Sequence, residues 1–149
     1  TGPEIISAMN GIGKSVDAFV AGVGTGGTLS GIGRALKKEN PNTKVYALEP
    51  SESPLLKDGK TGKHGIAAGF IPKNLDKDVY DGIVEVSTDE AMKIACEVAK
   101  NEGFLPGIFA GANIHGAIEL AKKLGKGHAV VTVSPDGGDR YLSTALFNE

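Results

Sequence analysis

The chain has 149 residues, which is enough for one domain with its own hydrophobic core. Apolar residues make up 40% and charged residues 23%, an ordinary balance for a globular protein. The net charge of −2 argues against a nucleic-acid-binding surface, and no apolar run is long enough to cross a membrane. Cys96 is the single cysteine, so an intrachain disulfide is impossible, which fits a reducing cytoplasm.

Strand and helix signals alternate along the first third of the chain. A short helix is expected over residues 3–9, and an apolar run at 16–21 predicts a strand buried on both faces. Residues 29–38 carry apolar side chains at helical spacing, and residues 44–49 form the next strand. A strand, a helix and a second strand in this order predict parallel strands joined by a right-handed crossover.

The same alternation continues after an irregular stretch at 51–82, whose length suggests a functional loop. Residues 83–86 read as a strand, and Ser87 with Glu90 forms a capping box that opens a helix ending at Gly103. A glycine-rich link at 106–111 leads to another helix and then to a last strand at 129–133. The sequence therefore predicts one α/β domain over residues 1–149, a three-layer Rossmann-like fold with a mainly parallel sheet.

A glycine-rich segment directly follows the first predicted strand. Gly22, Gly24, Gly26 and Gly27 stand within six positions, and Thr25 and Thr28 lie among them. A strand that ends in glycines and opens a helix is a phosphate-binding layout, because free N–H groups of the first helical turn point at the anion. The alternative is a tight turn that serves only the packing of helix on strand.

Spacing alone leaves the identity of the phosphate ligand open. The segment 22–27 fits the dinucleotide pattern G-x-G-x-x-G, and Glu49 ends the next strand, where an acid that binds ribose would stand. A nicotinamide or flavin domain is therefore one interpretation. A non-catalytic module that binds phosphate or a cofactor is another.

Four motifs together resemble the cysteine synthase (O-acetylserine sulfhydrylase) family of pyridoxal-phosphate enzymes, which includes cystathionine β-synthase. The resemblance extends over essentially the whole chain, and its motifs are Gly-Thr-Gly-Gly-Thr at 24–28, Val-Tyr-Ala-Leu-Glu-Pro at 45–50, Ala-Gly-Phe-Ile-Pro at 68–72 and Asp-Arg-Tyr-Leu-Ser-Thr-Ala-Leu-Phe at 139–147. The resemblance implies the fold-type II arrangement, of which this chain would be most of the larger, C-terminal domain.

The resemblance also implies a cofactor and a reaction. Pyridoxal 5'-phosphate would be held through its phosphate by Gly24, Thr25, Gly26, Gly27 and Thr28. The reaction would replace the acetate of O-acetylserine by sulfide, in a cytoplasmic homodimer that associates with serine acetyltransferase. We expect small-molecule substrates, no metal site, no nucleic acid and no membrane.

Two features depart from the family pattern. No lysine here stands in the family's Schiff-base motif, which lies upstream together with the loop for the substrate carboxylate. Without that lysine we expect the chain to be inactive alone, and because the sequence opens Thr-Gly-Pro-Glu without Met, we expect a piece cut from a longer protein. In addition, Phe109 stands where the family has a serine that hydrogen-bonds the pyridine nitrogen, and we expect its ring to pack in the core between helix and sheet.

Two smaller hypotheses concern charged side chains near the expected ligand. Asp139 and Arg140 are expected to form an ion pair that fixes the last loop, and this structural role is favoured over a direct contact with the ligand. His64 lies in the long irregular segment near the expected substrate side, and a solvated loop position is favoured for it over a substrate contact.

Overall fold

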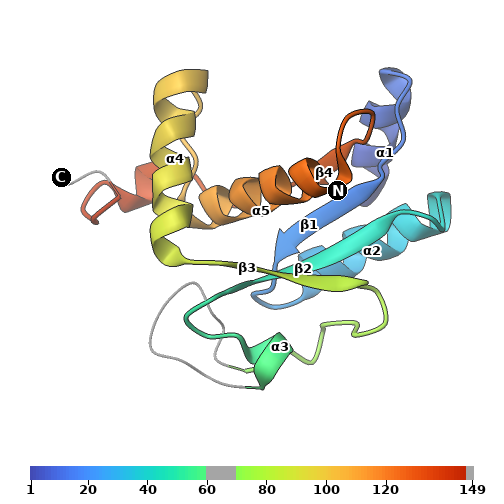
Figure 1. Cartoon of the computed structure of the whole chain (residues 1–149), viewed down its shortest axis with the longest axis horizontal. Helices are drawn as coiled ribbons and strands as arrows, with labels where there is room; N and C mark the ends of the chain where they lie inside the picture. Colours follow the sequence, from blue (N-terminus) through green and yellow to red (C-terminus); the bar gives the residue numbers. More distant parts are fainter. Residues whose placement is uncertain (60–69, 147–149) are drawn as a thin grey trace.

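The computed structural model describes residues 1–59 and 70–146, and it confirms an α/β fold around a parallel sheet (Figure 1). Within these residues the sheet has four strands in the order β3-β2-β1-β4, all of them parallel. The elements in chain order are α1 (Gly2–Gly11), β1 (Ala18–Gly22), α2 (Gly27–Glu39), β2 (Lys44–Pro50), α3 (Leu55–Asp58), β3 (Gly82–Val86), α4 (Thr88–Glu102), α5 (Ile108–Leu124), β4 (Val130–Thr132) and the 3-10 helix η1 (Gly138–Tyr141).

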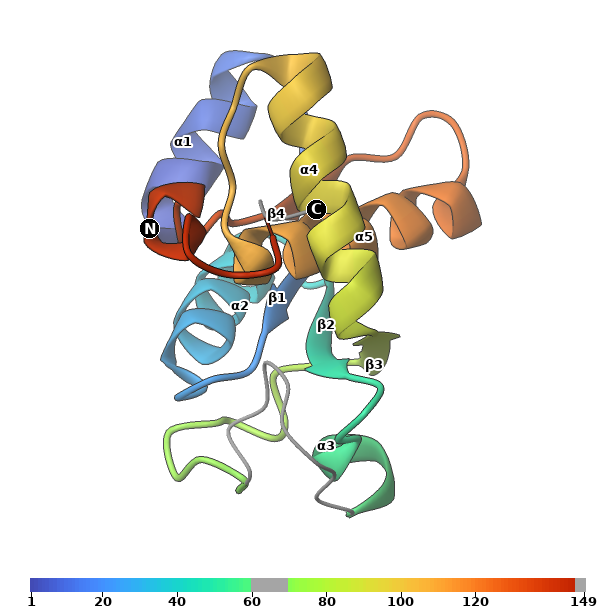
Figure 2. The same cartoon turned by 90° about the vertical axis from the view of Figure 1, so that its left-hand side faces the viewer.

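Helices cover both faces of the sheet, so the expected three layers are present (Figure 2). Alternate residues of the central strand point to opposite faces, as the pleat requires. Phe19 packs with Leu29 and Leu36 of α2, whereas Val20 packs with Ala112 and Leu120 of α5. The central strands β1 and β2 are therefore buried on both faces, which explains why they read as nearly continuous apolar runs.

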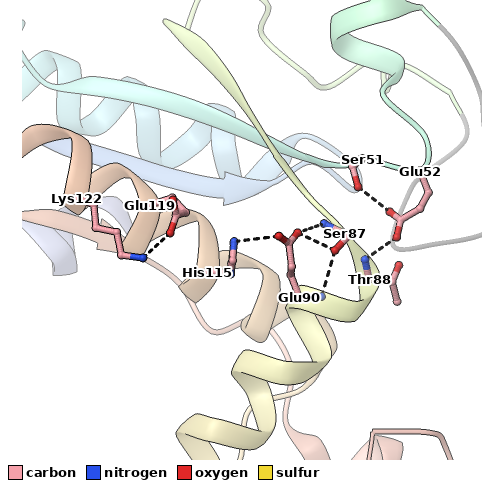
Figure 3. A network of polar contacts seen from close by, with 8 residues as sticks. All are labelled: Ser51, Glu52, Ser87, Thr88, Glu90, His115, Glu119 and Lys122. Atoms are coloured by element: carbon pink, nitrogen blue, oxygen red, sulfur yellow. Dashed lines mark hydrogen bonds and ion pairs between the residues drawn. The ribbon is translucent and has the colours of Figure 1, made fainter.

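The start of α4 shows how local sequence chemistry fixes a helix end (Figure 3). Ser87 accepts a hydrogen bond from the Glu90 N–H, and the Glu90 carboxylate accepts one from the Ser87 N–H, which is the predicted capping box. The Thr88 N–H donates to Glu52 at 2.7 Å, and this ties the segment after β2 to the same helix end. His115 of α5 approaches Glu90 at 3.9 Å across the two helices.

Two elements differ from the sequence-based expectation. The irregular stretch contains the short helix α3, and α5 begins at Ile108, inside the segment expected to be a link. Both errors have the same physical cause, because each helix start is stabilised by a carboxylate that belongs to another element or segment of the fold. Glu49 accepts from the N–H groups of Leu56 and Lys57, and Asp136 accepts from those of Phe109 and Ala110.

In the described part of the chain, no helix combines the length and the apolar character that crossing a bilayer requires.

A charged clamp joins the end of α2 to the start of β2. Asp81 contacts Lys37 at 2.8 Å, accepts from the Val45 N–H at 2.8 Å and lies 3.9 Å from Lys44. Burial raises the pKa of Asp81, but the hydrogen bonds from Lys37 and Val45 and the charges of both lysines outweigh burial and lower the pKa overall.

We expect Asp81→Asn to lower the free energy of unfolding at neutral pH by roughly 0.5–1.5 kcal/mol. Because the folded pKa lies below the unfolded value of about 3.9, this stabilisation is present above that pH and is lost as pH falls through the folded pKa. Urea titrations at several pH values measure it. The control is Asp78→Asn on an exposed carboxylate, and equal effects of the two substitutions at pH 7 would contradict the clamp.

Candidate functional site

A pocket of about 350 Å³ opens at the carboxyl ends of β1, β2 and β4. This is the edge at which open parallel sheets bind ligands, and the volume lies within the range of small-molecule sites. The glycine-rich segment forms one wall, and the start of α5 together with the segment after β4 forms the other. The lining residues are Ala21, Gly22, Val23, Gly24, Thr25, Gly26, Thr28, Leu48, Pro50, Phe109, Ala112, Asn113, Val133, Pro135, Asp136, Arg140 and Tyr141.

The backbone donors of this wall change from paired to free at Gly24. The Gly22 N–H donates to Asn113 and the Val23 N–H donates to the Leu48 carbonyl. From Gly24 to Gly27, the N–H groups have no acceptor among the described residues, and the first bond within α2 is donated by Ser30. Gly24 and its neighbours therefore present a row of unsatisfied donors at the positive end of the α2 dipole, and such an arrangement attracts an anion.

Of the five predicted site residues, Gly26 has a different role from the other four. Gly24, Thr25, Gly27 and Thr28 are exposed, whereas Gly26 is buried and has φ +82°. A Cβ at Gly26 would lie 2.7 Å from the Cα of Leu75, so glycine is required there by the backbone it packs against. The structure thus brings all five residues together in one loop, and at Gly26 it adds a steric requirement for glycine to the free backbone N–H.

The expected core position of Phe109 is wrong. Its side chain is 41% exposed and lines the pocket from the first turn of α5. Phe109 belongs to the helix because α5 begins at Ile108, where the backbone N–H of Phe109 donates to Asp136 at 3.1 Å. Phe109 thus gives an apolar surface to the part of the pocket opposite the glycine-rich segment.

The expected ion pair between Asp139 and Arg140 is also wrong, since the described residues give neither side chain an ionic partner. The last loop is held by Asp136 instead. Its Oδ1 accepts from the Ala110 N–H at 2.7 Å, and its Oδ2 accepts from the Phe109 N–H and from the Tyr141 hydroxyl at 2.6 Å.

Tyr141 stays protonated in this arrangement. Burial, then the hydrogen bond to Asp136 and the charge of that carboxylate, raise the pKa of Tyr141 to about 12. The hydroxyl therefore remains a donor throughout the physiological pH range. Asp136 and Tyr141 fix the start of α5 against η1, and both line the pocket.

Sequence reasoning missed Asn113, which joins the two strands at the pocket floor. Asn113 is 3% exposed, accepts from the Gly22 N–H at 2.8 Å and donates to the Val133 carbonyl at 2.8 Å. A signal was present, because Asn113 is a polar residue within a run of small apolar residues on the buried face of a helix. A buried amide in such a place has to be paired.

Glu49 is not a free acid that could bind a ribose, as the dinucleotide interpretation requires. Its side chain is 4% exposed, and both carboxylate oxygens accept backbone N–H groups at the start of α3, at 2.6 and 3.0 Å. The carboxylate is therefore occupied as a helix cap and does not line the pocket. The pattern at 22–27 consequently lacks the free acid that would bind a ribose at this position.

His64 and the residues 67–69 next to it lie outside the described part of the chain. So does Phe147 at the end of the last motif. Within the described ranges, no three His, Cys, Asp or Glu side chains gather into a group that could hold a metal ion.

Residues 1–136 match the family described as pyridoxal-phosphate dependent enzymes. This chain is a member of that family. Membership confirms the resemblance stated from the motifs, and it implies pyridoxal phosphate as the cofactor. The fold, with its parallel sheet and phosphate-loop layout, is that of the family's fold-type II enzymes.

Similar curated proteins carry the name cysteine synthase. The chain is 54% identical to cysteine synthase of Staphylococcus aureus and 46% identical to probable cysteine synthase of Bacillus subtilis, in each case over 99% of its length. These alignments cover 48% and 49% of the relatives. The chain therefore spans about half the length of the curated relatives it matches.

Solved structures agree with the sequence relatives. A hydrogen sulfide-producing enzyme of Fusobacterium nucleatum superposes with a TM-score of 0.93 at 45% identity, over 99% of this chain and 45% of that one. An O-acetylserine sulfhydrylase isoform of Entamoeba histolytica gives a TM-score of 0.93 at 39% identity, over 99% of this chain and 44% of that one. Both likenesses are well above the level at which only the fold is shared.

Proposed function

We propose that residues 1–149 are the C-terminal portion of a cysteine synthase-like enzyme, and that they hold the phosphate of pyridoxal phosphate. The whole protein would convert O-acetylserine and sulfide to cysteine and acetate. The observation that carries this proposal is the row of unpaired N–H groups from Gly24 to Gly27 at the wall of the pocket.

The residues present fit the cofactor's chemistry. A phosphate group is an acceptor of several hydrogen bonds, and the loop offers backbone N–H groups and the hydroxyls of Thr25 and Thr28, which have no partner among the described residues. A Cβ at Gly24 would meet nothing within 4 Å, so the backbone there is open to close approach by a ligand. The opposite wall carries apolar surface, suited to an aromatic ring.

These positions separate the chemistry that the cofactor supplies from the tasks of the protein's own residues. When bound, pyridoxal phosphate supplies the electron sink for replacement at the β-carbon of an amino acid. The chain's own residues bind the phosphate through the loop, fix the start of α5 through Asp136 and exclude water with Leu48, Ala112 and Phe109. No lysine lines the pocket among the described residues, and we assign the Schiff-base lysine to sequence outside residues 1–149.

The remaining expectations stay proposals. We propose a homodimer, an association with serine acetyltransferase and a cytoplasmic location, the last supported by the single cysteine. The small-molecule character of the substrates is supported by the size of the pocket and by the named relatives.

A loop glycine tests the phosphate site. Gly24→Ala adds a methyl group that touches nothing in the protein, so we expect an unchanged melting temperature. The same methyl group stands where the ligand phosphate must approach the backbone, and we expect affinity for pyridoxal phosphate to fall about 10-fold or more. Fluorescence titration of the full-length protein with the cofactor measures this loss.

The matched control is Gly31→Ala, another position where a Cβ meets nothing within 4 Å but which does not line the pocket. We expect cofactor binding and synthesis of cysteine from O-acetylserine and sulfide to be unchanged in this control. Tight binding of NAD together with no binding of pyridoxal phosphate would contradict the proposal in favour of a dinucleotide domain. Cofactor binding without turnover by the full-length protein would favour a non-catalytic module.

A further inference from the structure

Among the described residues, two charged side chains line the pocket, and only one of them already has hydrogen-bond partners within the protein. Asp136 accepts three hydrogen bonds, from two N–H groups at the start of α5 and from the Tyr141 hydroxyl, so its carboxylate oxygens already have partners within the protein. Arg140 lies one residue before Tyr141 on η1 and is exposed, and its guanidinium has no ionic or hydrogen-bond partner among the described residues. Among the described residues that line the pocket, Arg140 is therefore the cation that is free to bind an anion.

The glycine-rich loop and the helix η1 that carries Arg140 follow neighbouring strands of the sheet. The loop follows β1, and η1 follows β4, which pairs directly with β1. A phosphate at the loop finds the N–H groups of residues 24–27 and two threonine hydroxyls, which are enough donors for its oxygens without Arg140. Arg140 is thus left for a second anion in the same pocket.

We propose that Arg140 recruits the anionic sulfur nucleophile, hydrosulfide, into the pocket. This inference rests on the proposed function and names the residue that recognises the second substrate. An exposed cation at the rim meets the reactant that enters from solvent after the cofactor and the amino acid are bound, and it raises the local concentration of an anion. The carboxylate of the amino acid is expected to be held by the upstream loop that the family resemblance implies.

The reaction balances with this role. Hydrosulfide donates an electron pair to form the new C–S bond at the β-carbon, the bond between the β-carbon and the ester oxygen breaks, and acetate leaves with the electron pair of that C–O bond. Hydrosulfide and O-acetylserine carry one negative charge in total, and so do cysteine and acetate. Arg140 binds and orients the anion and is not itself changed.

The test uses the full-length protein loaded with pyridoxal phosphate. We expect Arg140→Gln to raise KM for hydrosulfide roughly 5- to 20-fold, with little change in KM for O-acetylserine. Arg140→Lys keeps the charge and is expected to restore most of the affinity at low salt. Higher ionic strength should weaken hydrosulfide binding in the wild type and have less effect in Arg140→Gln.

Lys126→Gln is the matched control. Lys126 is exposed, lies beyond the opposite end of α5 and has no ionic partner among the described residues. Its substitution removes the same charge and should leave both KM values unchanged. An effect on hydrosulfide equal to that of Arg140→Gln would show a general field effect and overturn the assignment.

Anaerobic calorimetric titration with hydrosulfide separates this inference from the proposed function. Arg140-dependent binding without cysteine synthesis would refute the proposed reaction while supporting the anion site. Cysteine synthesis with an unchanged hydrosulfide KM in Arg140→Gln would overturn the inference alone. The inference would also be overturned if Arg140→Gln changed only KM for O-acetylserine, only the cofactor affinity or only the melting temperature. Failure of the wild type to bind hydrosulfide would overturn it as well.

Discussion

Replacing Gly26 by alanine is expected to lower the free energy of unfolding by about 2–4 kcal/mol, because two costs add. Gly26 has φ +82°, a conformation that L-residues adopt only at a penalty. The new Cβ would also lie within 2.8 Å of the backbone N, the Cα and the Cβ of Leu75. Backbone atoms cannot rotate away as a side-chain end does, so the loop or its neighbour has to move.

Leu75 is poorly able to retreat. Ser30 of α2 donates to the Asn74 carbonyl and accepts from the Asp76 N–H, and Arg34 of the same helix binds the Asp76 carboxylate at 2.7 Å. The residues on both sides of Leu75 are thus anchored to the helix that Gly26 precedes. The close contact with Leu75 can then be relieved only if the glycine-rich loop itself moves. We therefore expect loss of cofactor binding together with the loss of stability.

Gly13→Ala is the control that separates the two costs. Gly13 has φ +68°, and a Cβ there would meet nothing within 4 Å. We expect it to cost only the conformational penalty of about 1–2 kcal/mol and to leave cofactor binding unchanged. The measurements are urea unfolding and cofactor titration. Equal losses of stability in the two variants would show that the contact with Leu75 is not restrictive.

The fold was predictable because its signals are local. The alternation of β1, α2 and β2 followed from apolar runs and helical spacing, and the capping box at Ser87 marked the start of α4 to within a residue. The five residues of the glycine-rich loop could be proposed as a phosphate site for the same reason, since their spacing lies within one short segment. Family membership then followed from four such segments in order.

The errors concern contacts between residues far apart in sequence. Asp136 stabilises the start of α5 from 26 positions away, and without knowledge of that bond residues 106–111 read as a glycine-rich link. The same contact turns Phe109 toward the pocket, so its core assignment failed together with the helix boundary. The requirement for Gly26 likewise depends on Leu75, which no spacing rule connects with it.

Asp136 is the second position where a large effect is expected. Asp136→Ala removes the acceptor of three hydrogen bonds, from the Phe109 N–H, the Ala110 N–H and the Tyr141 hydroxyl. Two orphan N–H groups at a helix start and a half-buried hydroxyl then lose their partner, and we expect a loss of about 2–4 kcal/mol in the free energy of unfolding. Chemical unfolding of the purified protein measures this loss.

Three further variants show how much of the stability lost in Asp136→Ala belongs to the bond with Tyr141. Tyr141→Phe removes one of the three bonds and keeps the ring, so we expect about 1 kcal/mol. The same variant in an Asp136→Ala background should cost less than it does alone, because its partner is already gone. Asp139→Asn changes an exposed carboxylate nearby and is expected to be neutral.

Additive losses for Asp136→Ala and Tyr141→Phe would contradict a shared contact. A coupled loss, accompanied by weaker cofactor binding, would show that one carboxylate positions the wall of the pocket opposite the phosphate loop.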